Sequence, residues 1–530
     1  MKNLGEACFV IVFFFPQLNL PLTRLLMPDS TAQPMGYRLL RERHAVACLP
    51  HDVESFSLSR GTRRTEIAPD GRRTEYRVRQ WPGDADYDHL EFALCYEGLH
   101  LGLLRTLLPR LDPFKTAEYI RSKPTGVYAR RIWYLCETFT GIRLDLPDAT
   151  QGNYVDLADP RSYYTGVPER SPRHRVNMNL LGTPAFSPII RRTKALTKWE
   201  SQRLDERSRK VVADIPPELH ERALQYLYSR ETKSSYAIER ETPDQQRAAR
   251  FVAALREAAS RDYLQKDALV SLHRTVVDAR FANDGWRDSI GEQNYVGTSL
   301  AAGDEQIHFV SPRPEDLGPL MESFLEASRR ILRAEINPVL AAAAIAWPFV
   351  FLHPFSDGNG RLHRFLIHYV LAFLRFAPDG AIFPVSACML RRKRAYDASL
   401  ETFSKPLLPL VDFTLDARGH LTVQNETRDF YRYPDCTAIA DVLFGFVAET
   451  IETELPNEIR FLQQYDEARR LMREVVDLPN RHADLFVRLC VQNKGTLSKV
   501  RRRLEEFAKL SADEIDRLEV AVREAFALPG

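Results

Sequence analysis

The stretch that most constrains this chain joins two long apolar segments through a short loop. Residues 337–352 and 362–376 are rich in apolar side chains, and each is long enough to form a helix. Between them stands His-Pro-Phe-Ser-Asp-Gly-Asn-Gly-Arg-Leu-His-Arg, residues 353–364. Two glycines flank the asparagine and permit positive φ there. The pattern therefore predicts a tight loop that opens onto the first turn of a second helix.

The residue types in this loop suit a phosphate site. Successive N–H groups of a glycine-rich turn can converge on an anion, and the following helix adds the unpaired N–H groups of its first turn. Arg361 and Arg364 lie three positions apart and so share one helix face. Asp357 is the kind of carboxylate that Mg²⁺ takes together with substrate phosphates. His353, just before the loop, is placed to act as a general base at neutral pH.

These residues resemble the signature of the Fic family, His-x-Phe-x-Asp/Glu-Gly-Asn-Gly-Arg-x-x-Arg, at all eight specified positions. The resemblance implies an enzyme that transfers AMP from ATP to a hydroxyl group of a target protein. It implies that His353 deprotonates the hydroxyl, that Asp357 holds Mg²⁺ and that Arg364 binds the γ-phosphate. The α- and β-phosphates would contact the rest of the loop: Gly358, Asn359, Gly360 and Arg361. The alternative is a plain turn between buried helices, which has no use for the aspartate and the two arginines.

A second stretch, Ser-Ser-Tyr-Ala-Ile-Glu-Arg at residues 234–240, resembles the inhibitory motif of the same family. Ser235 and Glu239 are four positions apart and share one face of a helix. The resemblance implies that Glu239 pairs with Arg364 and takes the place of the γ-phosphate. The sequence departs from the family pattern at Arg240, where the family has Gly or Asn. The alternative is a solvated glutamate in a surface pair worth about 0–1 kcal/mol.

Residues 287–310 predict a β-hairpin in which residues 293–297 pair with residues 307–310 across a Gly303-Asp304 turn. This hairpin resembles the flap of the family, where a target segment docks by adding a strand to the hairpin edge. The resemblance also implies that Val296 and Gly297 contact the nucleotide. The alternative is an ordinary surface hairpin.

Downstream, residues 391–403 predict a helix. Tyr396 and Ser404 resemble positions that line the adenine pocket in relatives, and core packing is the alternative for Tyr396. Upstream of the loop, Pro348 stands five residues before His353 and predicts a bend in its helix.

The remaining sequence predicts a mainly α fold: a Fic-type helical core with a β-hairpin flap, flanked by largely helical regions. We expect a leader at residues 1–30, a mixed but mostly helical region at 31–205, the core with its inhibitory helix at 206–405 and a helical region at 406–530. Within the second region we predict a hairpin around Gly71, a helix over residues 88–108 and a helix pair broken at 124–126. At the end of the chain, residues 483–492 and 496–507 resemble a helix-turn-helix. A charged bundle helix is the favoured reading there, and DNA binding is the minor one.

Composition narrows the functional class. The chain has 73 Lys+Arg against 71 Asp+Glu, a balance that argues against a protein devoted to nucleic acids or membrane surfaces. The seven cysteines are scattered without a CxxC pair, which fits a reducing cytoplasm and argues against a disulfide framework. The hydrophobic run Cys8–Phe15 is too short to span a bilayer, and Met27 is a plausible true start. We therefore expect a cytoplasmic protein without membrane contact, with homo-oligomerisation left open.

Two other functions remain open at this stage. One is a nucleotide-sensing regulator that binds ATP, and DNA or a partner, without efficient transfer. The other is a Fic-type enzyme that removes AMP or moves another phosphate-containing group. The chain has no GxxxxGK[ST] run, which argues against a P-loop NTPase.

Overall fold

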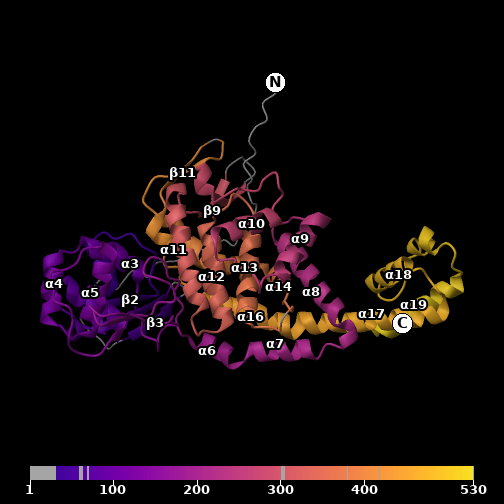
Figure 1. Cartoon of the computed structure of the whole chain (residues 1–530), viewed down its shortest axis with the longest axis horizontal. Coiled ribbons are helices and arrows are strands. Elements are labelled where there is room, and N and C mark those ends of the chain that lie inside the picture. Colours follow the sequence, from indigo (N-terminus) through magenta and orange to yellow (C-terminus); the bar gives the residue numbers. More distant parts are fainter. Residues whose placement is uncertain are drawn as a thin grey trace, which may run out of the picture. The chain divides into compact units, whose positions relative to one another are not determined.

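The structure, a computed structural model, describes residues 32–58, 64–68, 71–299, 305–378, 380–416 and 418–528. The predicted leader and the predicted Gly303-Asp304 turn lie outside these ranges. The described part is mainly helical, as the sequence predicts (Figure 1). It forms two compact units. The first comprises the chain up to residue 202 with residues 235–376 and 389–444, and the second comprises residues 203–234, 377–388 and 445 onward.

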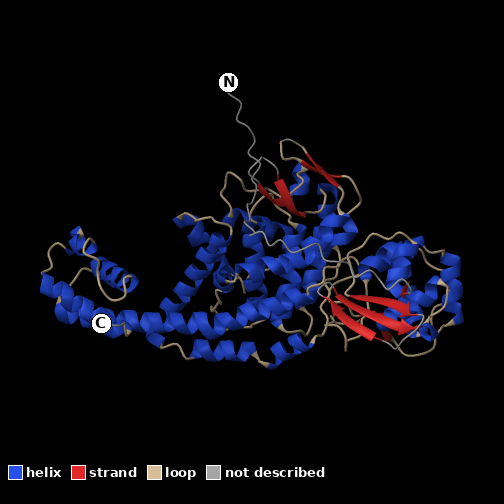
Figure 2. Ribbon diagram, turned by 180° about the vertical axis from the view of Figure 1, so that it is seen from behind, coloured by secondary structure: helices blue, strands red, loops and turns tan. Residues whose placement is uncertain are grey.

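The N-terminal part of the first unit contains the main sheet of the chain (Figure 2). Its strand order is β1-β2-β4-β3, and only the central β2–β4 pair is parallel. The strands are β1 (Ala32–Met35), β2 (Val53–Leu58), β3 (Arg64–Ala68) and β4 (Gly71–Arg77). The antiparallel β3–β4 pair confirms the predicted hairpin. A second small sheet, in the order β5-β7-β6, consists of β5 (Val155–Asp156), β6 (Glu169–Ser171) and β7 (Val176–Met178).

The main sheet contributes Met35 and Tyr76 to a small separate cluster with Phe92. Five helices pack with the second small sheet around a common hydrophobic core. They are α1 (Gly36–Arg43), α2 (Asp86–Tyr96), α3 (Leu101–Leu107), α4 (Pro113–Ser122) and α5 (Val127–Thr140). The gap between α4 and α5 confirms the predicted break. The single helix predicted over residues 88–108 is wrong, because the chain leaves the helix after Tyr96 and Gly98 takes φ +94°. A Cβ at Gly98 would lie 2.3 Å from the Tyr163 hydroxyl, so this turn requires glycine.

The helical core of the first unit is built around α12 (Pro338–Leu352) and α13 (Asn359–Phe373), which pack side by side (Figure 1). Helix α12 is apolar on every face, and all of its residues except Pro338 and Val350 are buried. A helix of this kind belongs in the centre of a core. It continues through Pro348 to its end at Leu352. The helices around this pair are α9 (Gln245–Arg256), α10 (Lys266–Val276), α11 (Pro314–Leu332) and α15 (Lys393–Leu407).

Two hairpins complete this part of the first unit. The predicted flap is present as β8 (Tyr295–Ser299) and β9 (Glu305–Val310), which pair antiparallel with a bulge at Val296/Gly297. A shorter hairpin joins β10 (Phe413–Leu415) and β11 (Leu421–Val423). Helix α6 (Lys194–Ser201) also belongs to this unit.

The second unit has its own hydrophobic core. Helices α17 (Leu455–Val475), α18 (Asn480–Gln492) and α19 (Ala512–Phe526) supply it, and α7 (Leu204–Ala213) lies in the same unit. Helices α8 (Pro217–Ile238), α14 (Val385–Arg391) and α16 (Thr437–Glu449) each have residues in both units. The predicted helix over residues 496–507 is wrong. That segment forms two separate 3₁₀ turns, Arg501–Arg503 and Glu505–Phe507, because Leu504 between them is extended at ψ 146°.

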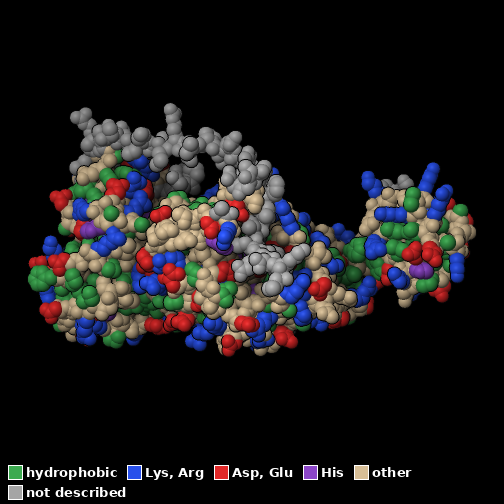
Figure 3. All heavy atoms as spheres, turned by 90° about the horizontal axis from the view of Figure 1, so that it is seen from above, with side chains coloured by type: hydrophobic (Ala, Val, Ile, Leu, Met, Phe, Trp, Pro, Cys, Tyr) green, Lys and Arg blue, Asp and Glu red, His purple; other side chains and the backbone are tan. Residues whose placement is uncertain are grey.

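Two further features are the distribution of charge on the surface and the length and polarity of the helices. Acidic and basic side chains alternate over the face in Figure 3, in agreement with the near-zero net charge. None of the described helices has the length and apolar character needed to cross a bilayer.

Candidate active site

The loop between α12 and α13 is closed by its own side chains. His353 ends α12 at φ +50°, and Gly358 precedes α13 at φ +79°. The buried Asn359 side chain donates to the Phe355 carbonyl at 2.7 Å and accepts from the Phe355 N–H at 3.0 Å. The resemblance assigned Asn359 to the phosphates. Its amide is occupied with Phe355, so only its backbone N–H is left for an anion.

His353 has one ring nitrogen bonded to the main chain and the other without a partner among the described residues. Its Nδ1 lies 3.1 Å from the Val350 carbonyl oxygen, which places the proton on Nδ1 and the lone pair on Nε2. Nε2 is buried and has no hydrogen-bond partner among the described residues. Burial, with a smaller contribution from the positive charge of Arg287, lowers the pKa of His353 to about 4. The imidazole is therefore neutral at pH 7 and can accept a proton.

Arg287 ties the flap to this histidine, and the sequence analysis missed it. The side chain is fully buried and carries no carboxylate partner among the described residues. Its Nε donates to the His353 carbonyl at 2.9 Å, Nη1 donates to the Glu292 carbonyl at 2.7 Å, and Nη2 donates to the Pro312 carbonyl. Glu292 precedes β8 and Pro312 follows β9. One guanidinium thus joins both ends of the flap to the start of the loop.

A second support that the sequence analysis missed comes from α10. The His273 ring stacks on Phe355 with centroids 4.0 Å apart and planes at 4°. Its Nε2 lies 3.1 Å from the Asp357 carbonyl oxygen. A Cβ at Gly358 would lie 2.5 Å from Val277 Cγ2, so glycine is required there for space as well as for its φ. The contacts of His273 and Val277 therefore fix the position of the loop backbone.

Glu239 lies between the two arginines of the loop. Its Oε1 accepts from Arg364 Nη2 at 2.7 Å, and its Oε2 forms an ion pair with Arg361 Nε at 2.8 Å. All three side chains are buried, with 1–6 % of their surface exposed. Ser235, one turn earlier, accepts from Arg364 through its hydroxyl at 2.8 Å and through its carbonyl at 2.7 Å. The solvated surface pair considered as the alternative for Glu239 is wrong.

Arg240 explains how the chain leaves this helix without the glycine or asparagine of the family pattern. It adopts the left-handed conformation at φ +60°, which costs a non-glycine residue about 1–2 kcal/mol. The N–H groups of Arg240 and Glu241 then bond back to the carbonyls of Ala237 and Tyr236 at 3.0 and 3.1 Å. The helix therefore ends at this point without a glycine or asparagine, at a cost in backbone energy.

The turn at Arg240 places a further carboxylate, that of Glu241, beside Arg361. Glu241 Oε2 lies 3.0 Å from Arg361 Nη1, and Asp357 Oδ2 lies 2.9 Å from Arg361 Nη2. Arg361 is thus paired with three carboxylates, those of Glu239, Glu241 and Asp357. Burial raises the pKa of Glu241, although Arg361 acts against the shift. An acidic residue two positions after Glu239 is the signal by which the sequence could have revealed this pair.

A cavity of about 310 Å³ lies over the loop, beneath the flap. Seven of the predicted site residues line it: His353, Gly360, Arg364, Glu239, Val296, Tyr396 and Ser404. The other six do not: Gly358, Asn359, Arg361, Asp357, Gly297 and Ser235. Tyr396 is buried and contacts Arg364, so its hydroxyl is engaged with the arginine. His353 and the Glu239–Arg364 pair therefore line the same cavity.

Comparison with known proteins relates one segment of the chain to a family. The Fic/DOC family model matches residues 263–371, which include α10, the flap, α12, the loop and most of α13. The chain contains a Fic/DOC family domain. "Protein adenylyltransferase Fic" of Nematostella vectensis is 30 % identical over 112 residues, which cover 21 % of this chain and 24 % of that protein. The protein of the same name from Culex quinquefasciatus is 31 % identical over 120 residues, which cover 22 % of this chain and 21 % of that protein.

The likeness outside this domain is small. The chain spans about a quarter or less of the length of these relatives. A solved structure of a Fic family protein from Desulfovibrio desulfuricans G20 has 15 % sequence identity and a TM-score of 0.36, covering 65 % of this chain and 87 % of that one. At these values the structural likeness adds nothing to the family assignment.

Asp357 fits Mg²⁺ only as part of a nucleotide complex. Its Oδ1 accepts from the Gly358 N–H at 2.6 Å, and its Oδ2 pairs with Arg361. The described residues contain no group of three or more His, Cys, Asp or Glu that could hold a metal ion. Mg²⁺ commonly binds through one or two carboxylates completed by phosphate oxygens and water, and a half-exposed carboxylate beside an anion site suits that mode.

Proposed function

We propose that this protein is a protein adenylyltransferase that moves AMP from ATP to a Ser, Thr or Tyr hydroxyl of a target protein. We further propose that Glu239 holds it in an inhibited state. The observation that carries the proposal is the Glu239 carboxylate between Arg361 and Arg364, in the cavity that His353 also lines. The relatives named as adenylyltransferases support the reaction class, over the Fic/DOC domain alone.

The carboxylate lies where an anion would bind. A Cβ at Gly360 would be 2.2 Å from Glu239 Oε1 and 3.1 Å from Arg364 Nη1. The carboxylate thus lies against the first turn of α13, where N–H groups and the positive end of the helix dipole attract anions. A triphosphate would need the same arginines and the same helix end. Glu239 and ATP therefore compete, and Glu239 must leave before ATP can bind productively.

The chemistry then needs three things from the chain. His353 Nε2 takes the proton of the target hydroxyl, whose oxygen forms a bond to the α-phosphorus while the bond from that phosphorus to the β-phosphate oxygen breaks. Pyrophosphate leaves with the electron pair. Arg361, Arg364 and the N–H groups of α13 hold the phosphates and offset their charge, which is most of what phosphoryl-type transfer requires. Mg²⁺ held by Asp357 would neutralise further phosphate charge.

The test uses ATP labelled either on the α- or on the γ-phosphate. Wild type, Glu239→Gly and the double variant Glu239→Gly/His353→Ala are incubated with each label in a cell lysate. Glu118→Gly is the matched control, because Glu118 is an exposed glutamate of α4. We expect Glu239→Gly to transfer the α-label at least tenfold more than wild type or Glu118→Gly. We expect no γ-label on protein and no transfer by the double variant.

Other outcomes would contradict the reaction or the inhibitory role proposed here. Transfer of γ-label would assign phosphate transfer in place of AMP transfer. Equal α-labelling by wild type and Glu239→Gly would remove the inhibitory role of Glu239. Mass spectrometry of the modified protein identifies the group that was added and the hydroxyl that received it.

A further inference from the structure

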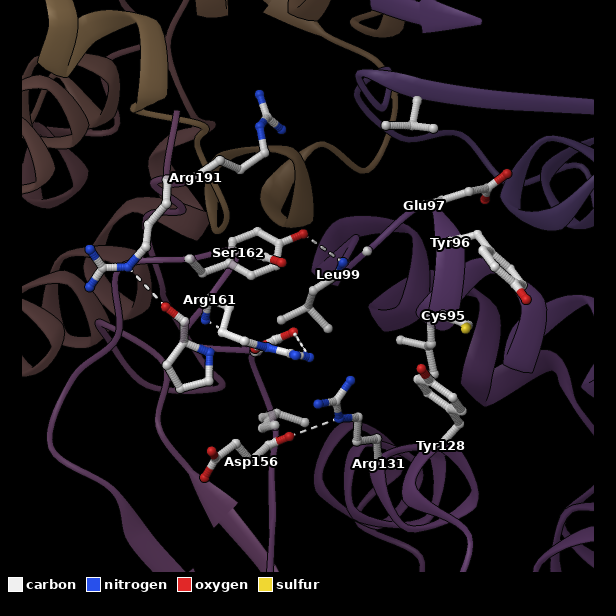
Figure 4. A pocket seen from close by; sticks show the side chains of 18 of the residues that line it. Cys95, Tyr96, Glu97, Leu99, Tyr128, Arg131, Asp156, Arg161, Ser162 and Arg191 are labelled. Carbon is white, nitrogen blue, oxygen red and sulfur yellow. Dashed lines mark hydrogen bonds and ion pairs between the residues drawn. The ribbon is translucent and has the colours of Figure 1, made fainter. Parts of the chain in front are cut away.

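A second cavity lies in the N-terminal part of the first unit, apart from the proposed site (Figure 4). Its volume is about 1130 Å³, and it is open to solvent. The C-terminal end of α2, the first turns of α5 and the loops at residues 155–163 and 191–193 line it. Pockets for small ligands usually measure about 300–1,000 Å³. An open cavity above that range suits a chain segment better than a single small molecule.

Arg131 presents an unused cation to this cavity. Its Nε donates to the Asp156 carbonyl at 2.7 Å, and its guanidinium lies 5.6 Å from the centroid of the Tyr128 ring. The end of the side chain points into the cavity (Figure 4). Among the described residues, neither Nη group has a hydrogen-bond or ion-pair partner, and burial lowers the pKa of Arg131. A guanidinium held at one edge, with two free N–H donors beside each other, is suited to bidentate binding of a carboxylate.

The other charged groups of the cavity, apart from Glu97, already have partners. Glu97 has no cation partner among the described residues: it accepts from the Tyr37 N–H at 2.8 Å, and burial raises its pKa to about 7. Arg161 binds Asp159 through two hydrogen bonds of 3.1 and 3.0 Å. Arg191 pairs with Asp52 at 2.8 Å and with Asp435 at 2.7 Å.

The remaining arginine and aspartate are also engaged. Arg192 donates through its Nε to the Pro160 carbonyl at 2.8 Å, as Arg131 does to Asp156, but its guanidinium also lies over the Tyr164 ring and bonds the Tyr164 hydroxyl. The Asp156 carboxylate accepts from the Asn177 amide at 2.8 Å. These acidic groups would repel a polyanion, whereas Arg131 can still take one carboxylate.

Apolar side chains stand at the rim beside this arginine. Tyr96 and Val127 both line the cavity, and they are 54 % and 43 % exposed. Tyr96 is the last residue of α2, and Val127 is the first residue of α5. Large apolar side chains next to an arginine recur where one polypeptide binds another.

We propose that this cavity binds an extended segment of another polypeptide in which a carboxylate is flanked by apolar side chains. The carboxylate binds Arg131 Nη1 and Nη2, and the apolar neighbours contact Tyr96 and Val127. The inference is independent of the proposed transfer reaction, because peptide binding needs neither ATP nor His353. Failure of one therefore leaves the other standing.

The test measures the fluorescence anisotropy of labelled peptide pools with the full chain, without nucleotide. One pool has a central Glu with mixed Leu, Ile, Val, Phe and Tyr on both sides, and the matched pool has Gln at the centre. Wild type is compared with Arg131→Met, Val127→Glu and the control Arg143→Met. Arg143 belongs to the same part of the chain, and 74 % of its side chain is exposed. Val127→Glu places a carboxylate at the first position of α5, where a helix tolerates acidic residues.

We expect wild type and Arg143→Met to bind the Glu pool at least tenfold tighter than the Gln pool. Arg131→Met should bind both pools equally, and Val127→Glu should weaken binding of the Glu pool by like-charge repulsion. If Arg131→Met fails to fold, as its melting curve would show, Val127→Glu decides. Equal binding of the two pools by wild type overturns the proposal, as does unchanged binding by the folded variants. Displacement of the Glu pool by an equimolar 20-nucleotide RNA would assign the cavity to nucleic acid instead.

Discussion

The carboxylate of Glu239 bridges Arg361 and Arg364, with Oε1 2.7 Å from Arg364 Nη2 and Oε2 2.8 Å from Arg361 Nε. The two arginines lie three residues apart at the start of α13, and Glu239 comes from the end of α8 more than a hundred residues earlier in the chain. Both partners are buried, so each depends on the other for its charge balance. Any group that displaces the carboxylate must supply equivalent negative charge, as a triphosphate does.

Glu239→Gly should lower stability and make it depend on ATP. Removing one partner of a buried ion pair typically costs about 3–5 kcal/mol, and the low end is expected here because Glu241 and Asp357 still pair with Arg361. Mg-ATP should restore about 2.7 kcal/mol at a hundredfold excess over its Kd. Thermal unfolding with and without Mg-ATP measures both effects. Glu118→Gly should respond to ATP as wild type does, and an ATP shift of the same size in wild type would contradict the competition.

Glu241→Gln should release part of the inhibition. It removes one of the three carboxylates on Arg361 and leaves the Glu239–Arg364 contact in place. We expect labelling with α-labelled ATP between that of wild type and that of Glu239→Gly, about two- to fivefold above wild type. The comparison variant is Asp244→Asn, which changes an exposed carboxylate three positions further along. Labelling by Glu241→Gln at the wild-type level would show that Arg361 does not need this partner.

His353→Ala should abolish transfer and spare nucleotide binding. The loss of a general base commonly lowers the rate by about 10²–10⁴-fold. The phosphate-binding groups lie in Arg361, Arg364 and the first turn of α13, and they do not depend on the imidazole. The variant is best made in the Glu239→Gly background, where ATP binding by calorimetry and labelling can both be followed. A double variant that still labels protein at the single-variant rate would place the base elsewhere.

The pH dependence of transfer should reveal the buried state of His353. Burial lowers its pKa from the ordinary 6.5 to about 4, so the basic form persists as the pH falls below neutrality. In the Glu239→Gly variant, kcat/KM should therefore stay level from pH 8 to about 6 and decline only as the pH approaches 5. An acid limb centred near 6.5 would indicate a solvated imidazole.

The same shift affects stability. The unfolded state binds the proton more readily than the folded state between pH 6.5 and 4, so the free energy of unfolding should fall as the pH drops through that range. His273, whose pKa burial also lowers to about 4, adds to the same trend.

Arg287→Lys should change the transfer reaction as well as stability. Lysine keeps the charge but lacks the planar group that holds three carbonyls, so the flap and the His353 carbonyl should lose their common anchor. We expect kcat to fall by about tenfold or more with a smaller change in KM for ATP. Arg130→Lys is a close control, because Arg130 is also buried and donates to three main-chain carbonyls, in the N-terminal part of the first unit. If both variants lose stability and neither loses kcat, Arg287 has only a structural role.

Local patterns in the sequence predicted much of the framework. The apolar runs on either side of residues 353–364 form α12 and α13, the Gly71 hairpin is present, and the flap pairs as expected. One error arose where a tertiary contact outweighed a local pattern, and the other arose where a single residue leaves the helical conformation. Gly98 breaks a continuous apolar periodicity because Tyr163 occupies the space of a side chain, and Leu504 is extended where its neighbours read as helical.

By itself, the sequence determined which side chains this loop carries, since the order of residues in twelve positions places an imidazole, a carboxylate, a glycine turn and two arginines within one loop and one helical turn. Only the tertiary structure decided which groups from distant segments reach that loop. Arg287 and His273 have no periodicity or spacing that links them to it, and Glu241 is linked only by its place two positions after Glu239. The contacts of all three depend on how α10, the flap and the end of α8 pack around α13. The same packing buries His353, which lowers its pKa and keeps the imidazole neutral well below pH 7.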